Sequence, residues 1–264
     1  MKHTDIDHLL IDAIDCARRA GTVALSYFRG GRQLDIHTKS GESDIVTAAD
    51  KASEAVIKDF IATHYPDHAI LSEESGESGG KAPWRWVIDP VDGTTNFSTG
   101  LPFWAISIGI EYGGEAVIGV VYVPFTDELF HAVKGGGAYL NGKQLHVSTD
   151  ENIAHAVVTT GFPVDKDVNP DNNLDNVAAV LPLVRGLRRL GAASVDMCYV
   201  AAGFLGAYWE LNLHEWDVCA STLIVTEAGG RCTRFRHDRN VSLLCGAPAI
   251  HDRILPLLSS EPRG

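Results

Sequence analysis

Residues 86–97 read Trp-Val-Ile-Asp-Pro-Val-Asp-Gly-Thr-Thr-Asn-Phe and carry the strongest structural signal in the chain. The apolar run at the start predicts a buried strand that ends at Asp89, and Pro90 predicts a turn directly after it. Asp92 returns a second carboxylate three residues later. We therefore expect two hard oxygen ligands to meet at one strand end.

The second half of this segment indicates an anion site. Gly93 permits close backbone approach, and Thr94, Thr95 and Asn96 predict the start of a helix whose free amides can bind a phosphate oxygen. Asp-Pro or Asp-Gly alone is an ordinary turn former, and Asp89 alone could cap a helix. The whole segment meets several requirements at once, which favours a phosphate held through a metal ion.

A second acidic segment follows the short apolar strand expected at 69–71. By itself the pair Glu73-Glu74 is typical of a solvated loop. Its position just before the Asp89 strand favours a shared metal site.

Three more acidic residues lie at predicted helix starts. Asp217 falls in the first turn of an apolar helix, where it would complement the helix dipole. Asp44 and Asp50 precede and open the helix expected at about 48–64, as an N-cap and a dipole partner. Each is explained by helix chemistry alone.

The composition indicates one compact globular domain, residues 1–264, with two lobes at about 1–150 and 151–264. Of the 264 residues, 45% are hydrophobic and 21% charged. Acidic residues outnumber basic ones by 34 to 22, which disfavours direct nucleic-acid contact. An anionic substrate would therefore need a local cation to bridge it to the protein.

Cysteine and hydropathy patterns favour a cytoplasmic protein without a membrane anchor. The five cysteines are scattered and form no Cys-x-x-Cys pair, so neither a disulfide framework nor a zinc knuckle is expected. The first residues turn acidic at once, unlike a signal peptide, and no segment reaches the roughly 18 apolar residues of a membrane span. The histidines, including His131 and His214, show no ligand spacing and are expected to be structural.

Hydrophobic periodicity predicts an α/β protein with two different halves. The first half has a helix at 6–28, with Thr4 as N-cap and Gly30-Gly31 as stop, and a polar loop at 30–44 before the helix at 48–64. A mostly antiparallel sheet follows, with strands at 69–71, 84–88, 104–112, 116–123, 129–133 and 138–140. The second half alternates strands at 157–160, 187–190, 207–211 and near Arg231 and Ser242 with helices at 172–184, 194–203 and 216–228.

These segments together resemble the inositol monophosphatase family over nearly the whole chain. In that family a Glu-Glu pair precedes Asp-Pro-Ile/Val-Asp-Gly-Thr-Thr-Asn-Phe, and Trp-Asp opens a later helix. Here the matching residues are Glu73-Glu74, 89–97 and Trp216-Asp217. The resemblance implies a layered α/β/α/β/α sugar-phosphatase fold, usually dimeric.

The resemblance also implies two or three Mg²⁺ ions. Glu73, Asp89 and the Val91 carbonyl would hold the first, and Asp89, Asp92 and Asp217 the second. Glu73 would help hold a third through water. A set of hard carboxylates without histidine suits magnesium.

The implied reaction is direct hydrolysis of a phosphate monoester without a phosphoenzyme. Thr94 and Asp50 would position a metal-activated water, with Glu73 also counted among the catalytic residues. Lys39, in the segment that matches a mobile loop of the family, would assist the third ion. The implied substrate contacts are Asp92, Gly93, Thr94, Thr95, Gly191, Ala192, Ala193, Glu210 and Asp217.

Departures from the family pattern bear on substrate preference. Ser72 replaces a common glycine, Ala192 and Ser194 alter the usual Gly-Thr-Ala-Ala run, and Cys219 replaces a small residue. Relatives hydrolyse fructose 1,6-bisphosphate, histidinol phosphate or adenosine 3′,5′-bisphosphate. Glu210 is a good acceptor for ring hydroxyls and favours inositol 1-phosphate.

Two alternatives do not require turnover. Some bacterial members of the family act in transcription complexes, so a regulatory protein-binding module is one. A metal-dependent binding protein is the other, although Asp50 and Thr94 would have no use there. An intact acid set favours the enzyme.

Overall fold

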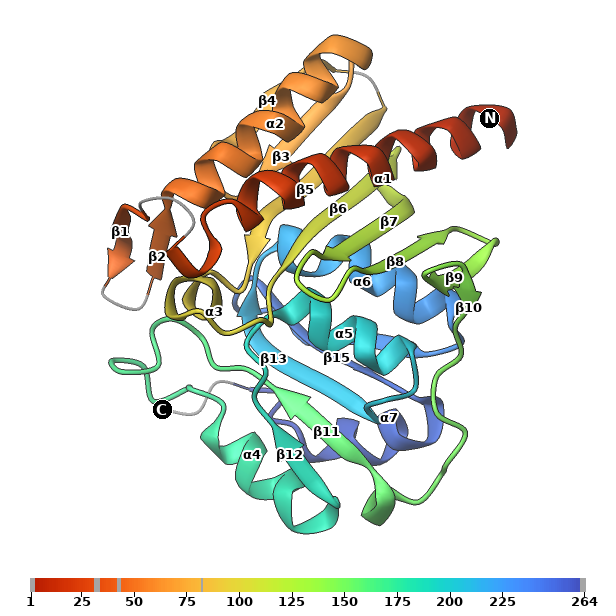
Figure 1. Ribbon diagram of the computed structural model, residues 1–264. Helices are drawn as coiled ribbons and strands as arrows, with labels where there is room; N and C mark the ends of the chain where they lie inside the picture. Colours follow the sequence, from red (N-terminus) through yellow and green to blue (C-terminus); the bar gives the residue numbers. More distant parts are fainter. Residues whose placement is uncertain (1–2, 31–33, 42–43, 82, 262–264) are drawn as a thin grey trace.

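Helices and sheets alternate in five layers (Figure 1). The computed structural model describes residues 3–30, 34–41, 44–81 and 83–261. Helices α1 and α2 cover the outer face of the first sheet, α5 and α6 lie between the two sheets, and α4 and α7 lie on the far side of the second. The expected α/β/α/β/α order is confirmed. The helices span His3–Leu25 (α1), Ala48–His64 (α2), Thr94–Thr99 (α3), Leu174–Val180 (α4), Ala193–Ala201 (α5), Glu215–Glu227 (α6) and Pro248–Ile254 (α7).

The first sheet has the strand order β10-β9-β8-β7-β6-β5-β3-β4. Its neighbours are antiparallel except β3 and β5, which run parallel. The mostly antiparallel first half is therefore confirmed. The strands span Ala69–Ser72 (β3), Gly76–Gly79 (β4), Trp84–Asp92 (β5), Ala105–Tyr112 (β6), Glu115–Val123 (β7), Glu128–Val133 (β8), Gly137–Leu140 (β9) and Lys143–Gln144 (β10).

The second sheet has the order β12-β11-β13-β15-β14. Strand β11 is parallel to both neighbours, and the remaining pairs are antiparallel. Strands and helices alternate along this half as expected. The strands span Val157–Thr160 (β11), Gly186–Arg188 (β12), Ala207–Leu213 (β13), Arg231–Arg236 (β14) and Val241–Gly246 (β15).

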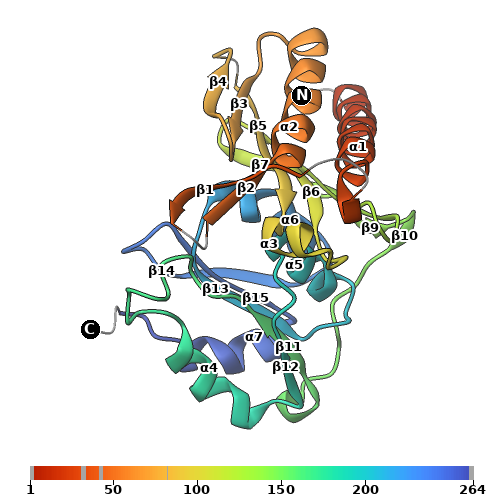
Figure 2. The same cartoon turned by 60° about the vertical axis from the view of Figure 1, so that its left-hand side comes forward.

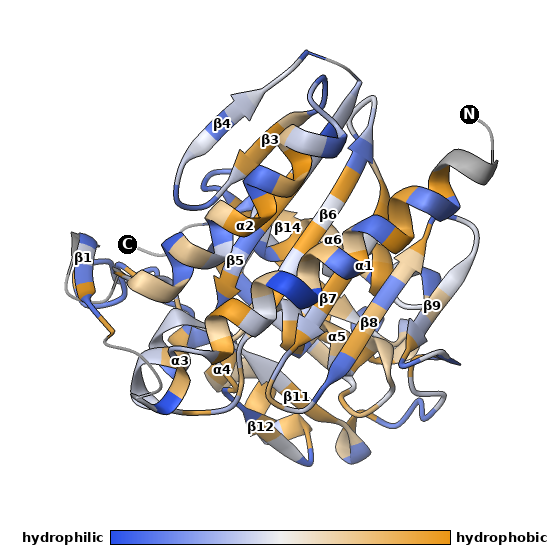
Figure 3. Cartoon of the chain, turned by 45° about the horizontal axis from the view of Figure 1, so that its top comes forward, coloured by the Kyte–Doolittle hydropathy of each residue, from blue (hydrophilic) through white to orange (hydrophobic). Residues whose placement is uncertain are grey.

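Apolar burial explains the layers. Figure 3 shows hydrophobic residues concentrated along β5, β6 and β7 and on the helix sides that face them. Strand β5 is covered on both faces, so Trp86 through Asp92 are all buried. A strand covered on both faces reads as a continuous apolar run, as this one does.

Two glycines bring α6 close to the first sheet. A Cβ at Gly109 would lie 2.4 Å from Cys219 Sγ, and one at Gly119 would lie 2.4 Å from the Ala220 carbonyl oxygen. Glycine is therefore required at both positions. This close packing carries the start of α6, with Asp217, toward the end of β5.

The segment expected as a polar loop at 30–44 contains regular structure. Strands β1 (Ile36–Gly41) and β2 (Asp44–Thr47) form an antiparallel hairpin, so the loop prediction was wrong over the described part. Few of its residues are apolar, which hid the strands from a periodicity argument. Thr47 caps α2, so Asp44 is not the N-cap.

Several element boundaries also differ. Helix α4 stops at Val180, because Pro182 lacks the amide donor, and the chain continues as a 3₁₀ turn over Leu181–Leu183. Helix α1 already includes Thr4 and ends at Leu25. The strand expected at 187–190 spans 186–188. Gly31 lies outside the described residues.

Some elements were not expected from the sequence. Strand β4 reads Gly-Glu-Ser-Gly and has no apolar residue, and α7 is short, although Pro248 at its first turn is a typical start signal. All five cysteines are free thiols. Among the described residues, none of the helices is both long and apolar enough to cross a membrane.

Candidate active site

The acidic residues of four elements meet where β5 ends. Asp89 and Asp92 lie among the last four residues of that strand. Glu73 follows its parallel neighbour β3, and the Glu73 amide lies 3.2 Å from the Ile88 carbonyl. Asp217 lies in the first turn of α6 and Asp50 in the first turn of α2. Figure 2 shows that α3 and the β1–β2 hairpin flank this region, between the two sheets.

These carboxylates are crowded; Asp50, Asp89 and Asp92 are buried, and Glu73 and Asp217 are partly buried. Burial raises the pKa of Asp89 well above its usual range, and the charges of Glu73, Asp92 and Asp217 raise it further. Burial likewise raises the pKa of Asp217 well above its usual range and that of Asp92 to about 6. Such a set is stable only when protons or cations compensate the negative charge.

One lysine supplies part of that compensation. Lys39, on the β1–β2 hairpin, donates to Glu73 at 2.8 Å and to Glu74 at 2.6 Å. Within the described part of the chain, no three carboxyl, imidazole or thiol groups already surround one point closely enough to hold an ion. The donor chemistry still fits Mg²⁺, because every candidate ligand is a hard oxygen.

Asp50, which is buried, and Thr94, which is partly buried, form a hydrogen-bonded pair beside these acids. The Asp50 carboxylate accepts from the Thr47 amide at 2.9 Å and from the Thr94 hydroxyl at 3.1 Å. The Thr94 hydroxyl also lies 3.1 Å from the Val91 carbonyl oxygen. Burial raises the pKa of Asp50, and the bonds from Thr47 act in the opposite direction. Asp50 therefore both caps α2 and points toward the end of β5.

The turn into α3 has the backbone that an anion site needs. Gly93 adopts φ 91°, and no side chain caps the helix behind it. A Cβ at Gly93 would lie 3.1 Å from Ala192 Cβ and 3.2 Å from the Gly191 carbonyl oxygen. A larger residue would therefore push the 191–193 segment away from the acids.

A cavity of about 400 Å³ opens beside this cluster. This volume is in the range of small-molecule sites. The cavity lies between the acids, the segment after β11 and the end of β13. Its lining residues are Lys39, Glu73, Asp92, Phe162, Pro163, Val164, Arg189, Gly191, Ala193, Glu210, Leu211, Asn212, Leu213, His214, Trp216 and Asp217.

Glu210 contributes a polar group on the β13 side of the cavity. Its carboxylate accepts from the Tyr208 hydroxyl at 2.7 Å. A Cβ at Gly161 would lie 1.9 Å from the carboxylate, so glycine leaves the space that Glu210 occupies. Burial raises the pKa of Glu210 to about 7, and the Tyr208 bond acts in the opposite direction.

A sequence model of the protein family described as "Inositol monophosphatase family" matches residues 5–263 of this chain. This chain belongs to the inositol monophosphatase family. Members of the family are phosphatases, and this chain is a phosphatase of that family.

Individual relatives agree with this assignment. The chain is 42% identical to "Nus factor SuhB" of Pasteurella multocida, over 94% of this chain and 96% of that protein. It is 39% identical to "Fructose-1,6-bisphosphatase/inositol-1-monophosphatase" of Aquifex aeolicus, over 90% of each. The inositol monophosphatase structure from Anabaena (Nostoc) sp. PCC 7120 aligns with TM-score 0.86 and 36% identity, over 98% of each chain.

The sequence predicted one part of the cavity lining and missed another. Lys39 and six of the predicted metal- and substrate-binding residues line the cavity, and Asp50, Asp89, Val91, Gly93, Thr94, Thr95 and Ala192 lie outside its lining. Thr95 is exposed at the start of α3. His131 stacks on Tyr139, as a structural residue would, whereas His214 lines the cavity. The six metal- and substrate-binding residues are Glu73, Asp92, Gly191, Ala193, Glu210 and Asp217.

The lining residues that sequence reasoning missed include Phe162, Pro163, Val164 and Arg189. Phe162, Pro163 and Val164 lie far from every motif in the sequence. Arg189 lies two residues before Gly191, and this proximity was the one available signal.

Proposed function

We propose that this protein hydrolyses the phosphate monoester of a small polyol, most readily inositol 1-phosphate, with Mg²⁺ as its cofactor. The observation that carries this proposal is the cluster of Glu73, Asp89, Asp92 and Asp217 beside the cavity, whose lining includes three of these acids and, on another wall, Glu210. A phosphate would bind at the acidic wall through the metal, and sugar hydroxyls would reach Glu210.

The proposed donor set would hold two ions. Glu73, Asp89 and the Val91 carbonyl would hold one, and Asp89, Asp92 and Asp217 would hold the other. A third ion would share Glu73 through water, beside Lys39. When bound, Mg²⁺ neutralises phosphate charge and lowers the pKa of water.

The chain's own residues would position the attacking water. The Thr94 hydroxyl donates to Asp50 Oδ1 and so presents a lone pair to a water molecule. Asp50 Oδ1 can then receive the proton that leaves through Thr94 Oγ, since its raised pKa makes it a better base. The uncapped amides of Gly93, Thr94 and Thr95 would hold the phosphate oxygens, and Gly191, Ala192 and Ala193 would contact the polyol.

Phosphate release by purified protein tests the proposal. The panel is inositol 1-phosphate, fructose 1,6-bisphosphate, histidinol phosphate and adenosine 3′,5′-bisphosphate, each with Mg²⁺ and with EDTA. Mg²⁺-dependent turnover that is fastest on inositol 1-phosphate is the expected result. A different fastest substrate would reject the substrate assignment, and no turnover on any would reject the catalytic proposal.

A protein-binding role is the second candidate, because several relatives are named "Nus factor SuhB". We propose that any such partner is a protein, in line with the net charge of −12. Complementation of a gene deletion separates the two roles. Full rescue by the Asp50→Asn variant would support a role that needs no turnover, and failure to rescue would support the enzyme.

We also propose a cytoplasmic homodimer. Exposed apolar side chains lie before, at the start of and directly after α4, which supports a subunit contact there. The residues are Val168, Leu174 and Leu181. Light scattering on eluted protein tests the dimer, and a monomer mass at micromolar concentration would reject it.

A further inference from the structure

One wall of the cavity is a long irregular segment. Residues 161–173 connect β11 to α4 without a helix or strand, and Phe162, Pro163 and Val164 line the cavity. Ordering a loop of this length costs conformational entropy, so a loop that shapes a binding site needs fixed anchors.

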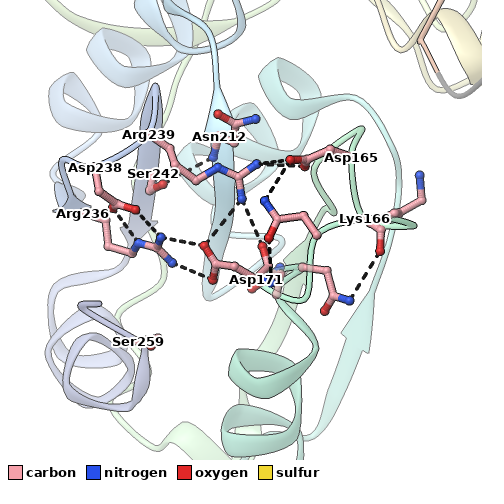
Figure 4. Close-up of polar contacts among 12 residues, drawn as sticks. Asp165, Lys166, Asp171, Asn212, Arg236, Asp238, Arg239, Ser242 and Ser259 are labelled. Atoms are coloured by element: carbon pink, nitrogen blue, oxygen red, sulfur yellow. Dashed lines mark hydrogen bonds and ion pairs between the residues drawn. The ribbon is translucent and has the colours of Figure 1, made fainter. Parts of the chain in front are cut away.

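The first anchor is a buried ion pair at the far end of this loop. The Arg236 side chain is fully buried and donates to both oxygens of Asp171, at 2.8 and 2.6 Å. It also donates to Asp238 at 2.9 and 2.6 Å, as Figure 4 shows. Because Arg236 ends β14, the loop is joined to the second sheet. Such a planar pair is rigid.

The second anchor lies next to the lining residues. Arg239 donates to both oxygens of Asp165 at 2.8 Å and to the Asp171 backbone carbonyl at 3.1 Å (Figure 4). Asp165 directly follows Val164, and it also accepts from the Asn169 side chain at 3.0 Å. One guanidinium therefore holds both ends of the 165–171 stretch.

The same turn also contacts the opposite wall. Arg239 lies between β14 and β15, and Ser242 in β15 accepts a hydrogen bond from the backbone amide of Asn212 at 3.3 Å. Asn212 lines the cavity with a φ of 61°. The turn after β14 and the start of β15 thus contact the cavity wall on two sides: Arg239 through Asp165, and Ser242 through Asn212.

We propose that the Arg239–Asp165 pair is a positioning contact that holds the Pro163–Val164 wall against the alcohol part of the substrate. It sets KM for polyol phosphates and leaves the hydrolytic step unchanged, since neither residue lies at the acidic wall. This inference rests on the proposed function. Arg239 is a better test than Arg236, whose full burial couples it to folding.

The experiment compares Arg239→Gln, Arg239→Lys and Asp165→Asn with Arg231→Gln. Arg231 is a matched control, because it begins β14 and also forms an ion pair, with Asp252, but both side chains are about half exposed and neither lines the cavity. KM and kcat are measured for inositol 1-phosphate and for the smaller glycerol 2-phosphate. Mass and Tm are measured on the same samples.

Arg239→Gln and Asp165→Asn are expected to raise KM for inositol 1-phosphate about tenfold, with kcat within about twofold. KM for glycerol 2-phosphate should change far less, and the mass should stay that of the wild type. Lysine keeps the charge but lacks the planar guanidinium that contacts both Asp165 and the Asp171 carbonyl. KM of Arg239→Lys should therefore lie between that of the wild type and that of Arg239→Gln. Arg231→Gln should match the wild type.

Two results would overturn the inference: unchanged KM in both variants, or equal losses on both substrates together with a lower Tm. If the wild type turns over none of the esters, the proposed function fails, and hydrogen–deuterium exchange decides the positioning role. Faster exchange over 162–170 in Arg239→Gln and Asp165→Asn, but not in Arg231→Gln, would support it. Equal exchange would reject it.

Discussion

Ser194, in the first turn of α5, donates both its backbone amide and its hydroxyl to the carboxylate of Asp92 at the end of β5. The hydrogen bond from the Ser194 amide measures 2.7 Å. The Ala193 amide donates a third hydrogen bond, of 3.2 Å, to the other carboxylate oxygen. Asp92 lies in the half of the chain that forms the first sheet, and Ser194 lies in the half that forms the second sheet. The orientation of a candidate metal ligand is therefore set by the opposite half.

Removing the Ser194 hydroxyl should weaken magnesium binding. Hydrogen bonds that orient a ligand are typically worth about 10- to 100-fold in metal affinity, so Ser194→Ala should raise the Mg²⁺ concentration for half-maximal activity about tenfold. The hydroxyl also lowers the pKa of Asp92 against the effect of burial, so its loss should move the acid limb of the pH–rate profile to higher pH. Magnesium titrations and pH profiles test both.

The control for this variant is Ser221→Ala, another buried serine, which bonds within α6 and to Met197. Its magnesium requirement should stay that of the wild type. Equal magnesium requirements in Ser194→Ala and the wild type would contradict the role of Ser194.

Asp50→Asn should abolish most turnover and spare magnesium binding. The amide cannot take up a proton from the Thr94 hydroxyl, so kcat should fall by about 10²- to 10⁴-fold. The asparagine oxygen can still accept from the Thr47 amide and cap α2, which should keep Tm near that of the wild type. Turnover assays and the Mg²⁺-induced rise in Tm measure the two effects. A kcat within tenfold of the wild type would reject the role of Asp50 as a base.

The parts of the site that the sequence predicts are those built by local structure. Asp89, Asp92 and Gly93 lie within one strand–turn–helix segment, so their relationship is visible in consecutive residues. Glu73 and Asp217 look like ordinary loop and helix-start residues by themselves; the position of Glu73 just before the Asp89 strand linked it to the rest, and only the family pattern linked Asp217. Their meeting depends on sheet pairing and on how closely α6 packs.

The missed features depend on long-range contacts. Ser194 departs from the family pattern, but its hydrogen bond to Asp92 joins two residues that are 102 positions apart in the sequence. The pairing of Arg239 with Asp165 spans 74 positions and carries no motif. The β1–β2 hairpin is mostly polar, so backbone pairing rather than an apolar face defines it.

The metal-free protein should lose stability as the pH rises toward neutrality. Burial raises the pKa of Asp92 to about 6 and that of Glu210 to about 7, so the folded state binds more protons than the unfolded state above about pH 4. The stability that these bound protons contribute is fully present below the pKa values of the two groups in the unfolded chain. It is lost as the pH rises through about 6 for Asp92 and about 7 for Glu210. For Asp92 a shift of about two units amounts to roughly 3 kcal/mol.

Tm measured in EDTA from pH 4.5 to pH 7.5 tests this expectation. Asp92→Asn should flatten the decrease, and Mg²⁺ should raise Tm more at pH 7.5 than at pH 5, because only ionised carboxylates bind it. Equal Mg²⁺ effects at both pH values, with no decrease in EDTA, would contradict the assignment.

Ser72→Ala should stabilise the protein. Ser72 ends β3, next to Glu73; it is fully buried, and its hydroxyl has no hydrogen-bond partner among the described residues. An unsatisfied buried hydroxyl costs about 1–3 kcal/mol, and alanine removes the polar group with little change of shape, so we expect a gain of about 1 kcal/mol in the free energy of unfolding.

Urea unfolding of Ser72→Ala is best read beside Ser53→Ala. The Ser53 hydroxyl is also buried, but it donates to the Pro90 carbonyl at 2.9 Å, so its removal leaves an acceptor without its donor and should destabilise by about 1 kcal/mol. Opposite signs in the two variants would show that hydrogen bonding, and not burial of serine as such, decides the effect. A loss of stability in Ser72→Ala would mean instead that the hydroxyl is satisfied in solution by an ordered water molecule.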